Sequence, residues 1–311
     1  MFDKVLIPTD FSKEAQKVLE CVGEIPGLKE VILLNVVDAG NPMNLEKKGW
    51  SYRSLIDEAE MRLAEQAEHI AYLGKKDIVV RTLLKIIVEP MGGADGVDLK
   101  RPEPRSEVGL IDGGSISEAI QKTAVSEEVS LIIMGAHGKG LVEGILLGSV
   151  STGVLGSGQT DLLIIRHQIL EGVEESGVEK FCTNIFSNVL ITTDFSVAAE
   201  GVVSLVKGMA NVHEIHLVHV ISKGKSIDEP AKKLNLLREV LDVPGRKIAV
   251  HVLEGNPANE ILTLAKKQDV SLIIMSSQGK GWLKQIRVGS TTSDVARRAD
   301  RPVMVVRPSN S

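Results

Sequence analysis

The sequence predicts two similar doubly wound α/β domains in one chain of 311 residues. Three observations lead to this prediction. Short apolar runs typical of buried parallel strands alternate with amphipathic segments typical of helices. The same order of segments occurs twice along the chain. Glycine or aspartate follows several of the apolar runs, at the point where such a sheet would place a ligand.

The internal repeat is the most specific of these observations. Residues 5–12, VLIPTDFS, match residues 189–196, VLITTDFS, at an offset of 184. Residues 131–140, LIIMGAHGKG, match residues 272–281, LIIMSSQGKG, at an offset of 141, so the first half carries 43 more residues between the two matches. Because a repeat this long is the size of a domain, we expect two domains and not the short units of a solenoid.

The first half contains the elements of one domain in order. Short runs of large apolar residues predict five strands, at 4–7, 30–37, 78–84, 131–134 and 162–166. Amphipathic segments predict four helices, at 13–22, 51–73, 115–124 and 150–157. Ser12 is a good N-cap for the first of these helices, and Ser115 or Ser117 for the third.

A segment rich in proline and glycine interrupts the first half. Between 85 and 110 we expect neither a helix nor an inner strand, because three prolines and three glycines fall at 89–108. The second half passes directly from its third strand to Gly255. We therefore interpret residues 89–108 as an inserted surface loop, with a lid over a functional site as the alternative.

The second half repeats the order of the first. Its five strands are expected at 188–192, 214–221, 247–253, 271–275 and 302–307, and its helices at 196–210, 228–241, 257–267 and 290–298. A polar and acidic stretch separates the halves. The predicted organisation is a first domain at 1–167, a linker at 168–187 and a second domain at 188–311.

The composition narrows the class of protein. A net charge of −5 argues against a nucleic-acid-binding protein, and 3% aromatic residues offer few stacking platforms for single strands. No apolar run reaches the roughly 20 residues that span a membrane, and the chain enters its first strand without a signal peptide. Cys21 and Cys182 form no metal or redox motif, so we expect a cytoplasmic protein with reduced cysteines.

The glycine-rich segment after the fourth strand carries the candidate chemistry. Gly135 ends that strand, Gly138 follows in the loop, and Gly148 with Ser149 opens the next helix. Glycine lets a ligand approach the backbone, and a helix start offers free N–H groups and a positive dipole end, so the segment predicts a phosphate site. A tight turn before an ordinary N-cap is the alternative. The spacing is not the dinucleotide fingerprint, since Glu143 stands where the third glycine is needed.

Three residues converge on this loop. Asp10, Val36 and Gly135 each lie at or near the carboxyl end of a predicted strand, where doubly wound sheets bind ligands. Together with the glycine spacing, this set resembles the universal stress protein family, and its ATP-binding branch in particular. The resemblance covers nearly the whole chain, twice, outside the loop at 89–108. It implies a fold of the Rossmann-like, adenine nucleotide alpha hydrolase-like type.

The resemblance also implies a site for ATP or AMP, with or without Mg²⁺. Asp10 would accept a hydrogen bond from the ribose or the adenine, Val36 would lie against the base, and the loop and helix start would hold the phosphates. Implied residues of the first site are Pro8, Thr9, Asp10, Val36, Met134, Gly135, His137, Gly138, Gly148, Ser149, Val150 and Ser151. Those of the second site are Asp194, Val220, Met275, Gly279, Gly289, Ser290 and Thr291.

Each assignment has a plainer alternative. Asp10 is also suited to cap the first helix, Val36 and Met134 to fill the core, and His137 to face solvent. The second half departs from the pattern, because Ser276 stands in place of Gly135 and Thr192 in place of Pro8. A Cβ at Ser276 would crowd the ribose or displace the loop, so the first site ranks above the second.

Catalysis has little support in the sequence. No Ser-His-Asp or Cys-His arrangement and no metal-ligand spacing is recognisable. We therefore expect a regulatory nucleotide-binding module of the stress response, with no membrane or nucleic-acid partner. A slow ATPase or nucleotide-transfer enzyme using the same pocket is one alternative, and a nucleotide-free interaction scaffold is another.

The resemblance implies one further contact, between the two halves. The last strand of each half, at 162–166 and 302–307, would pair edge to edge with the other. Such pairing would turn the chain into a pseudo-dimer and cover two exposed sheet edges. Further association into a homo-oligomer is left open.

Overall fold

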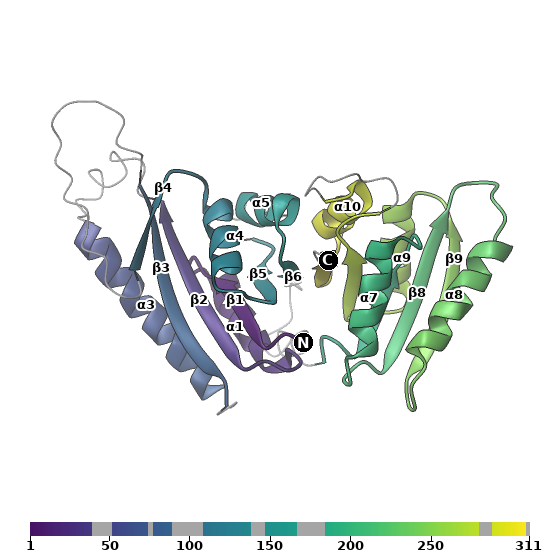
Figure 1. Ribbon diagram of the computed structural model, residues 1–311, viewed down its shortest axis with the longest axis horizontal. Coiled ribbons are helices and arrows are strands. Elements are labelled where there is room, and N and C mark those ends of the chain that lie inside the picture. The colour runs from purple at the N-terminus through teal and green to yellow at the C-terminus, as the bar shows by residue number, and fades with distance from the viewer. Residues whose placement is uncertain are drawn as a thin grey trace, which may run out of the picture.

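The computed structural model describes residues 1–38, 52–73, 77–88, 108–137, 147–166, 184–279 and 288–308. Within these ranges, eleven strands form a single sheet that runs through both halves of the molecule (Figure 1). The strand order is β4-β3-β2-β1-β5-β6-β11-β10-β7-β8-β9. The two halves therefore lie side by side and share one continuous sheet.

The first half follows the predicted order of strands and helices. Its elements are β1 (Lys4–Pro8), α1 (Lys13–Glu20), a 3₁₀ turn (Cys21–Glu24), β2 (Glu30–Asp38), α3 (Tyr52–Tyr72), β3 (Val79–Val88), β4 (Val108–Asp112), α4 (Ile116–Ser126), β5 (Leu131–Gly135), α5 (Ser149–Ser157) and β6 (Asp161–Ile165).

The second half repeats this order with one strand fewer. Its elements are β7 (Asn188–Thr192), α7 (Val197–Lys207), β8 (Glu214–Ile221), α8 (Asp228–Leu241), β9 (Lys247–Glu254), α9 (Pro257–Lys267), β10 (Leu272–Ser276), α10 (Ser290–Arg298) and β11 (Val303–Val306).

Local sequence explains where four of the eight α-helices in the described ranges begin. In these four, a polar N-cap side chain accepts a hydrogen bond from a backbone N–H of the first turn, which otherwise has no partner. The caps are Ser12 for α1, Ser115 for α4, Ser196 for α7 and Asn256 for α9. Helices α5 and α10 differ, since their N-caps are Gly148 and Gly289 and make no side-chain capping bond.

The sheet topology fixes where a ligand site can form. In the first half β1 pairs in parallel with both β2 and β5, and in the second half β7 pairs in parallel with both β8 and β10. The strand order thus reverses at β1/β5 and at β7/β10. Ligands in doubly wound sheets bind beyond the carboxyl ends of the strands at such a reversal.

The halves join through the predicted pairing of their last strands. Strand β6 is antiparallel to β11, with Leu162 opposite Val305, Leu163 opposite Met304 and Ile164 opposite Val303. All six side chains are fully buried. The edge-to-edge contact expected between these strands is therefore confirmed.

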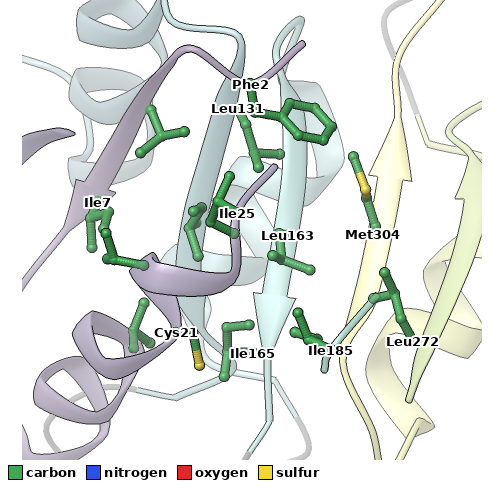
Figure 2. Packing of buried hydrophobic residues seen from close by; sticks show 14 of the residues in the cluster. Phe2, Ile7, Cys21, Ile25, Leu131, Leu163, Ile165, Ile185, Leu272 and Met304 are labelled. Carbon is green, nitrogen blue, oxygen red and sulfur yellow. The ribbon is translucent and has the colours of Figure 1, made fainter. Parts of the chain in front are cut away.

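The hydrophobic core is continuous across the junction. One buried cluster extends from β1 and α1, through β5 and β6, to β11 and β10, and Figure 2 shows Leu163 and Met304 on neighbouring strands within it. Ile185 and Phe186, which fall in the predicted linker, are also fully buried in this cluster. Residues 168–183 of that linker lie outside the described residues.

Two expectations about residues 85–110 were wrong. Strand β3 continues to Val88, because Ile86, Ile87 and Val88 are β-branched and buried, and it ends before Pro90. Strand β4 follows at Val108–Asp112 as the edge strand next to β3, so the first half has six strands and not five. The inserted segment itself, 89–107, lies outside the described residues.

The expectation of reduced cysteines was also wrong at Cys21, which is disulfide-bonded. Its side chain is 1% exposed at the end of α1 and lies within the core cluster of Figure 2. Tertiary proximity decides such a bond, and sequence spacing carried no sign of it. The second cysteine of the sequence, Cys182, lies outside the described residues.

Among the helices of the described ranges, none is long and apolar enough to cross a membrane.

Candidate functional site

A pocket of about 340 Å³ lies at the carboxyl ends of β7, β8 and β10 in the second half. It is closed on one side by α9, through Pro257 and Ile261, and at its end by the first turn of α10. All seven residues predicted for the second site line it, namely Asp194, Val220, Met275, Gly279, Gly289, Ser290 and Thr291. The structure thus brings together residues that are spread over almost a hundred positions of the sequence.

A tight turn after β7 positions Asp194. The N–H of Thr193 donates to the carbonyl of Val218 at 3.0 Å, and Oδ1 of Asp194 accepts from the N–H of Ser196 at 3.0 Å. Phe195 adopts a left-handed conformation with φ of 60°, which turns the chain into α7. The aspartate is therefore held by the backbone in the lining of the pocket, just ahead of α7.

The first half contains the same turn after β1. The N–H of Thr9 donates to the carbonyl of Leu34 at 2.8 Å, Oδ1 of Asp10 accepts from the N–H of Ser12 at 2.9 Å, and Phe11 has φ of 61°. The alternative that Asp10 caps α1 does not hold, because the N-cap is Ser12. Asp10 instead holds the N-cap residue, Ser12, in place by accepting a hydrogen bond from its backbone N–H.

The glycine loop of the second half packs against this aspartate. A Cβ placed on Gly279 would lie 2.6 Å from Oδ2 of Asp194, closer than two such atoms can approach. Glycine at this position therefore lets the loop lie directly over the carboxylate. The corresponding Gly138 of the first site lies outside the described residues.

The same pair of hydrogen bonds closes the loop in both halves. In the second half the N–H of Gly289 donates to the carbonyl of Ser277, and the hydroxyl of Thr292 donates to the carbonyl of Ser276, both at 2.8 Å. In the first half the hydroxyl of Ser151 likewise donates to the carbonyl of Gly135, at 2.9 Å. This side chain ties α5 to the end of β5.

The first half adds a backbone bond of the same kind. The N–H of Gly148 donates to the carbonyl of Ala136 at 2.8 Å. The first intrahelical bonds then run from Thr152 to Gly148 in α5, and from Ser293 to Gly289 in α10. The N–H groups of the residues between them have no partner within the helix and point out of its end. Both helix starts thus present donors and the positive end of a dipole.

The remaining predicted residues of the first site divide by exposure. Met134 is only 6% exposed and belongs to the core, which agrees with the plainer alternative given for it, whereas Ser149 is exposed and Val36 is half-buried. Four others are also half-buried: Pro8, Gly135, His137 and Val150. Met275 corresponds to Met134 in the second half and is 3% exposed, yet still lines the pocket.

His219 is a pocket residue that the sequence analysis missed. Its Nδ1 lies 2.7 Å from the carbonyl of Thr193, and its ring packs on Phe195 with centroids 4.5 Å apart. Asn35 takes its place in the first half, where Nδ2 donates to the carbonyl of Thr9 at 2.8 Å. The sequence does contain a signal for this residue. Both halves have a polar residue at this position of a buried strand, at the repeat offset of 184.

Ser276 lines the pocket without filling it. Its hydroxyl donates to the carbonyl of Gln278 at 2.8 Å, so it is used within the loop. In the first half, a Cβ on Gly135 would lie 3.1 Å from the carbonyl oxygen of His137, a tight contact. The second half accommodates the extra atoms, and the expected crowding of a ribose by Ser276 stays a prediction.

Metal chemistry gains no support from the described residues. Among them, no group of three or more His, Cys, Asp or Glu side chains is arranged to hold a metal ion.

Together, the topology and the pocket define the class of protein. It is a tandem doubly wound α/β protein, with a pocket between a fixed aspartate and an uncapped helix start at the carboxyl edge of the second sheet. The model of the universal stress protein family matches residues 1–166 and 186–307. The chain belongs to this family.

Individual relatives agree with this assignment. The universal stress protein MJ0577 of Methanocaldococcus jannaschii is 29% identical over 159 residues, which is 41% of this chain and 98% of the relative. The universal stress protein MT2052 of Mycobacterium tuberculosis is 23% identical over 296 residues, 89% of this chain and 86% of the relative. The crystal structure of a universal stress protein from Archaeoglobus fulgidus covers 99% of both chains, with a TM-score of 0.70 and 27% identity. The tandem arrangement therefore occurs in a solved structure of the same family.

Proposed function

We propose that this chain binds an adenine nucleotide, ATP or AMP, in each half and serves as a regulatory module of the stress response. The observation that carries the proposal is the pocket at the β7/β10 reversal, which is lined by both a fixed carboxylate and a helix start without a side-chain cap. A volume of about 340 Å³ falls in the range of ligand pockets, which is about 300–1,000 Å³.

The residues that line the pocket suit both the phosphates and the nucleoside of a nucleotide. At the helix end, free N–H groups and the exposed hydroxyl of Ser290 suit phosphate oxygens. In the same lining, Asp194 suits the hydroxyls of a ribose, and Val220 and Ile261 offer apolar surface to a base. Glycine at 279 keeps the loop close to the carboxylate, where a side chain would displace it.

The described residues of the first half support a second site of the same kind. Asp10 is held by the same turn, and Gly148 begins α5 in the same way. The bond from Ser151 to Gly135 repeats the bond from Thr292 to Ser276. The proposal therefore includes both halves, and the departures at Ser276 and Thr192 tune the second site without removing it.

The test is calorimetric titration of nucleotide-stripped protein with ATP and Mg²⁺, and then with AMP. We expect two ATP per chain, falling to one in Asp10→Ala and to one in Asp194→Ala. Saturation at about 100 times the Kd should also stabilise the chain by about 2.7 kcal/mol per site. No heat and no thermal stabilisation by either nucleotide would contradict the proposal.

A matched pair of variants tests the phosphate end separately. Gly148 has φ of −65°, and a Cβ there would lie 3.4 Å from the carbonyl of Ala136, so a side chain can be added without unfolding the turn. Gly148→Val should remove ATP binding at the first site while the melting temperature stays near that of the wild type. Gly201→Ala, where nothing lies within 4 Å of the added Cβ, is the control and should leave ATP binding unchanged.

A further inference from the structure

The two helices with glycine N-caps end at the junction between the halves. Figure 1 shows α5 and α10 on either side of this junction. Their N-termini point to the proposed phosphate sites, and their C-termini point toward the opposite half. An arginine from that opposite half reaches each C-terminus.

Arg307 of the second half binds the end of α5. It follows β11 directly, and its guanidinium Nη2 donates to the carbonyl of Leu155 at 2.7 Å and to that of Val154 at 3.3 Å. The residue is only 9% exposed. A Cβ on Gly158, the C-cap of α5, would lie 3.3 Å from this Nη2, so glycine there leaves room for the arginine.

Arg166 of the first half binds the end of α10 in the same way. It follows β6, and its Nη2 donates to the carbonyl of Ala296 and, at 2.9 Å, to that of Arg297. The residue is 7% exposed. Arg166 and Arg307 are counterparts at the repeat offset of 141, so the two contacts form a reciprocal exchange.

Both arginines remain charged at neutral pH despite their burial. Burial lowers the pKa of Arg166 to about 10, against the opposing effect of Asp300, and lowers that of Arg307 to about 10, against Asp161. A cation at the C-terminus of a helix interacts favourably with the negative end of its dipole, as an anion does with the N-terminus. Each nine-residue helix is thus suited to hold a phosphate at one end and the other half's arginine at its other end.

One backbone contact connects the second site directly to α5. The N–H of Val288 donates to the carbonyl of Gly156 at 3.4 Å. Val288 immediately precedes Gly289, the N-cap of α10 that lines the pocket. The position of α5 therefore affects the loop that precedes α10, the helix proposed to hold the phosphates of the second site.

We propose that Arg307 and Arg166 are positioning residues for the nucleotide site of the opposite half. Arg307 holds α5 so that its first turn meets the phosphates of the first site, and Arg166 does the same for α10 and the second site. Each site is then complete only when the other half is present. This inference rests on the proposed nucleotide binding.

The test measures one site at a time in the full chain. Asp194→Ala leaves only the first site, and Asp10→Ala leaves only the second. In the Asp194→Ala background, Arg307→Ala should weaken ATP binding by about tenfold while adenosine binding, which lacks phosphate contacts, changes less than about twofold. Arg307→Lys keeps the cation and should restore most of the loss.

Arg166→Ala should act in the same way on the second site, in the Asp10→Ala background. The controls are two exposed arginines whose contacts stay within their own half. Arg298 pairs with Asp294 in the second half, and Arg81 pairs with Glu127 in the first. Arg298→Ala should leave ATP binding at the first site unchanged, and Arg81→Ala should leave it unchanged at the second.

Two results would overturn the inference. One is an equal loss of ATP and adenosine affinity in Arg307→Ala, which is what general loosening of the junction produces. The other is no loss at all.

A second measurement separates this inference from nucleotide binding itself. Without nucleotide, amide hydrogen exchange within α5 should be faster in Arg307→Ala than in Arg298→Ala, and exchange within α10 should be faster in Arg166→Ala than in Arg81→Ala. If the wild type binds no ATP, the proposed function fails, and unchanged exchange in both helices would then overturn the positioning role as well. Faster exchange confined to the helix of the opposite half would support it.

Discussion

Leu163 of β6 lies directly opposite Met304 of β11, and the two residues are counterparts in the internal repeat, 141 positions apart. An approximate twofold axis therefore passes between them, and the antiparallel register on either side follows from it. Both side chains are fully buried in the cluster of Figure 2. The centre of the junction is thus a contact between one position of the repeat and its own copy.

This contact predicts energetic coupling across the junction. Leu163→Ala and Met304→Ala should each lower the free energy of unfolding by about 2–5 kcal/mol, because each leaves a cavity in a buried site. The double variant should deviate from the sum by at least about 0.5 kcal/mol, since the two sites are adjacent. Urea unfolding measures all three. As a control, Leu163→Ala combined with Leu241→Ala, on the outer helix α8, should be additive.

Gly279 offers a local test of the second site. In Gly279→Ala the new Cβ would lie 2.6 Å from Oδ2 of Asp194, so the carboxylate must turn away. We expect ATP binding at the second site to fall by at least about tenfold, with the free energy of unfolding changed by less than about 1 kcal/mol. Titration of the Asp10→Ala background measures this. Unchanged affinity would show that the carboxylate takes no part in binding.

Two neighbouring histidines predict sensitivity to acid. Nδ1 of His216 lies 3.1 Å from Nε2 of His251. Burial lowers the pKa of both below the usual 6.5; nearby Glu214 opposes this at His216, and His216 and Lys267 reinforce it at His251. The unfolded chain therefore binds protons more readily than the folded one. Stability that is complete above pH 6.5 should be lost as the pH falls below that value.

The measurement is the free energy of unfolding between pH 5 and pH 8, a range set by the usual pKa of histidine, about 6.5. The double variant His216→Leu/His251→Leu should show a shallower fall on acidification than the wild type. His213, which is exposed, provides the control, and His213→Gln should keep the slope of the wild type. A double variant with the full slope would assign the effect to other groups.

Asp161 predicts the opposite dependence. Burial raises its pKa from 3.8 to about 6, although its Oδ1 accepts from the N–H of Arg307 at 2.7 Å. The folded chain then holds this proton more tightly than the unfolded one, so the contribution of Asp161 is greatest below pH 3.8 and is lost as the pH rises through about 6.

Asp161→Asn keeps an acceptor for Arg307 and removes the charge. Relative to the wild type, it should be more stable at high pH by up to about 3 kcal/mol, which corresponds to the rise of the pKa of Asp161 from 3.8 to about 6, and equally stable in acid. Chemical unfolding at the two extremes of pH gives the difference. A variant less stable than the wild type at high pH would contradict the prediction.

Sequence reasoning reached most of the fold because strong local signals mark its boundaries. Helix α9 begins after Asn256 at Pro257, and α10 begins after Gly289, and both ranges agree with the predictions. The end of β3 was predicted too early, because the prolines and glycines that follow Val88 led us to assign the buried residues before them to the loop. Strand β4 was missed because five residues with a glycine carry too weak a signal.

The candidate site was predictable only in part, for a related reason. The aspartates and glycines of the site could be predicted, because they recur at the repeat offsets in both halves of the sequence. The role of His219 depends on its strand lying beside the turn after β7, a relationship that exists only in three dimensions. The contacts that Arg166 and Arg307 make in the opposite halves likewise join residues that no short segment contains.

The axis between Leu163 and Met304 also determines how freely the two halves can differ. In a homodimer of one such domain, every substitution appears on both sides of the axis, so a change must suit both sites at once. In this chain each structural position is encoded twice, and leucine faces methionine where a homodimer would pair a residue with itself. Asn35 and His219, or Gly135 and Ser276, show that the two copies have already diverged. The fused sheet therefore permits specialisation of one pocket while the other stays unchanged.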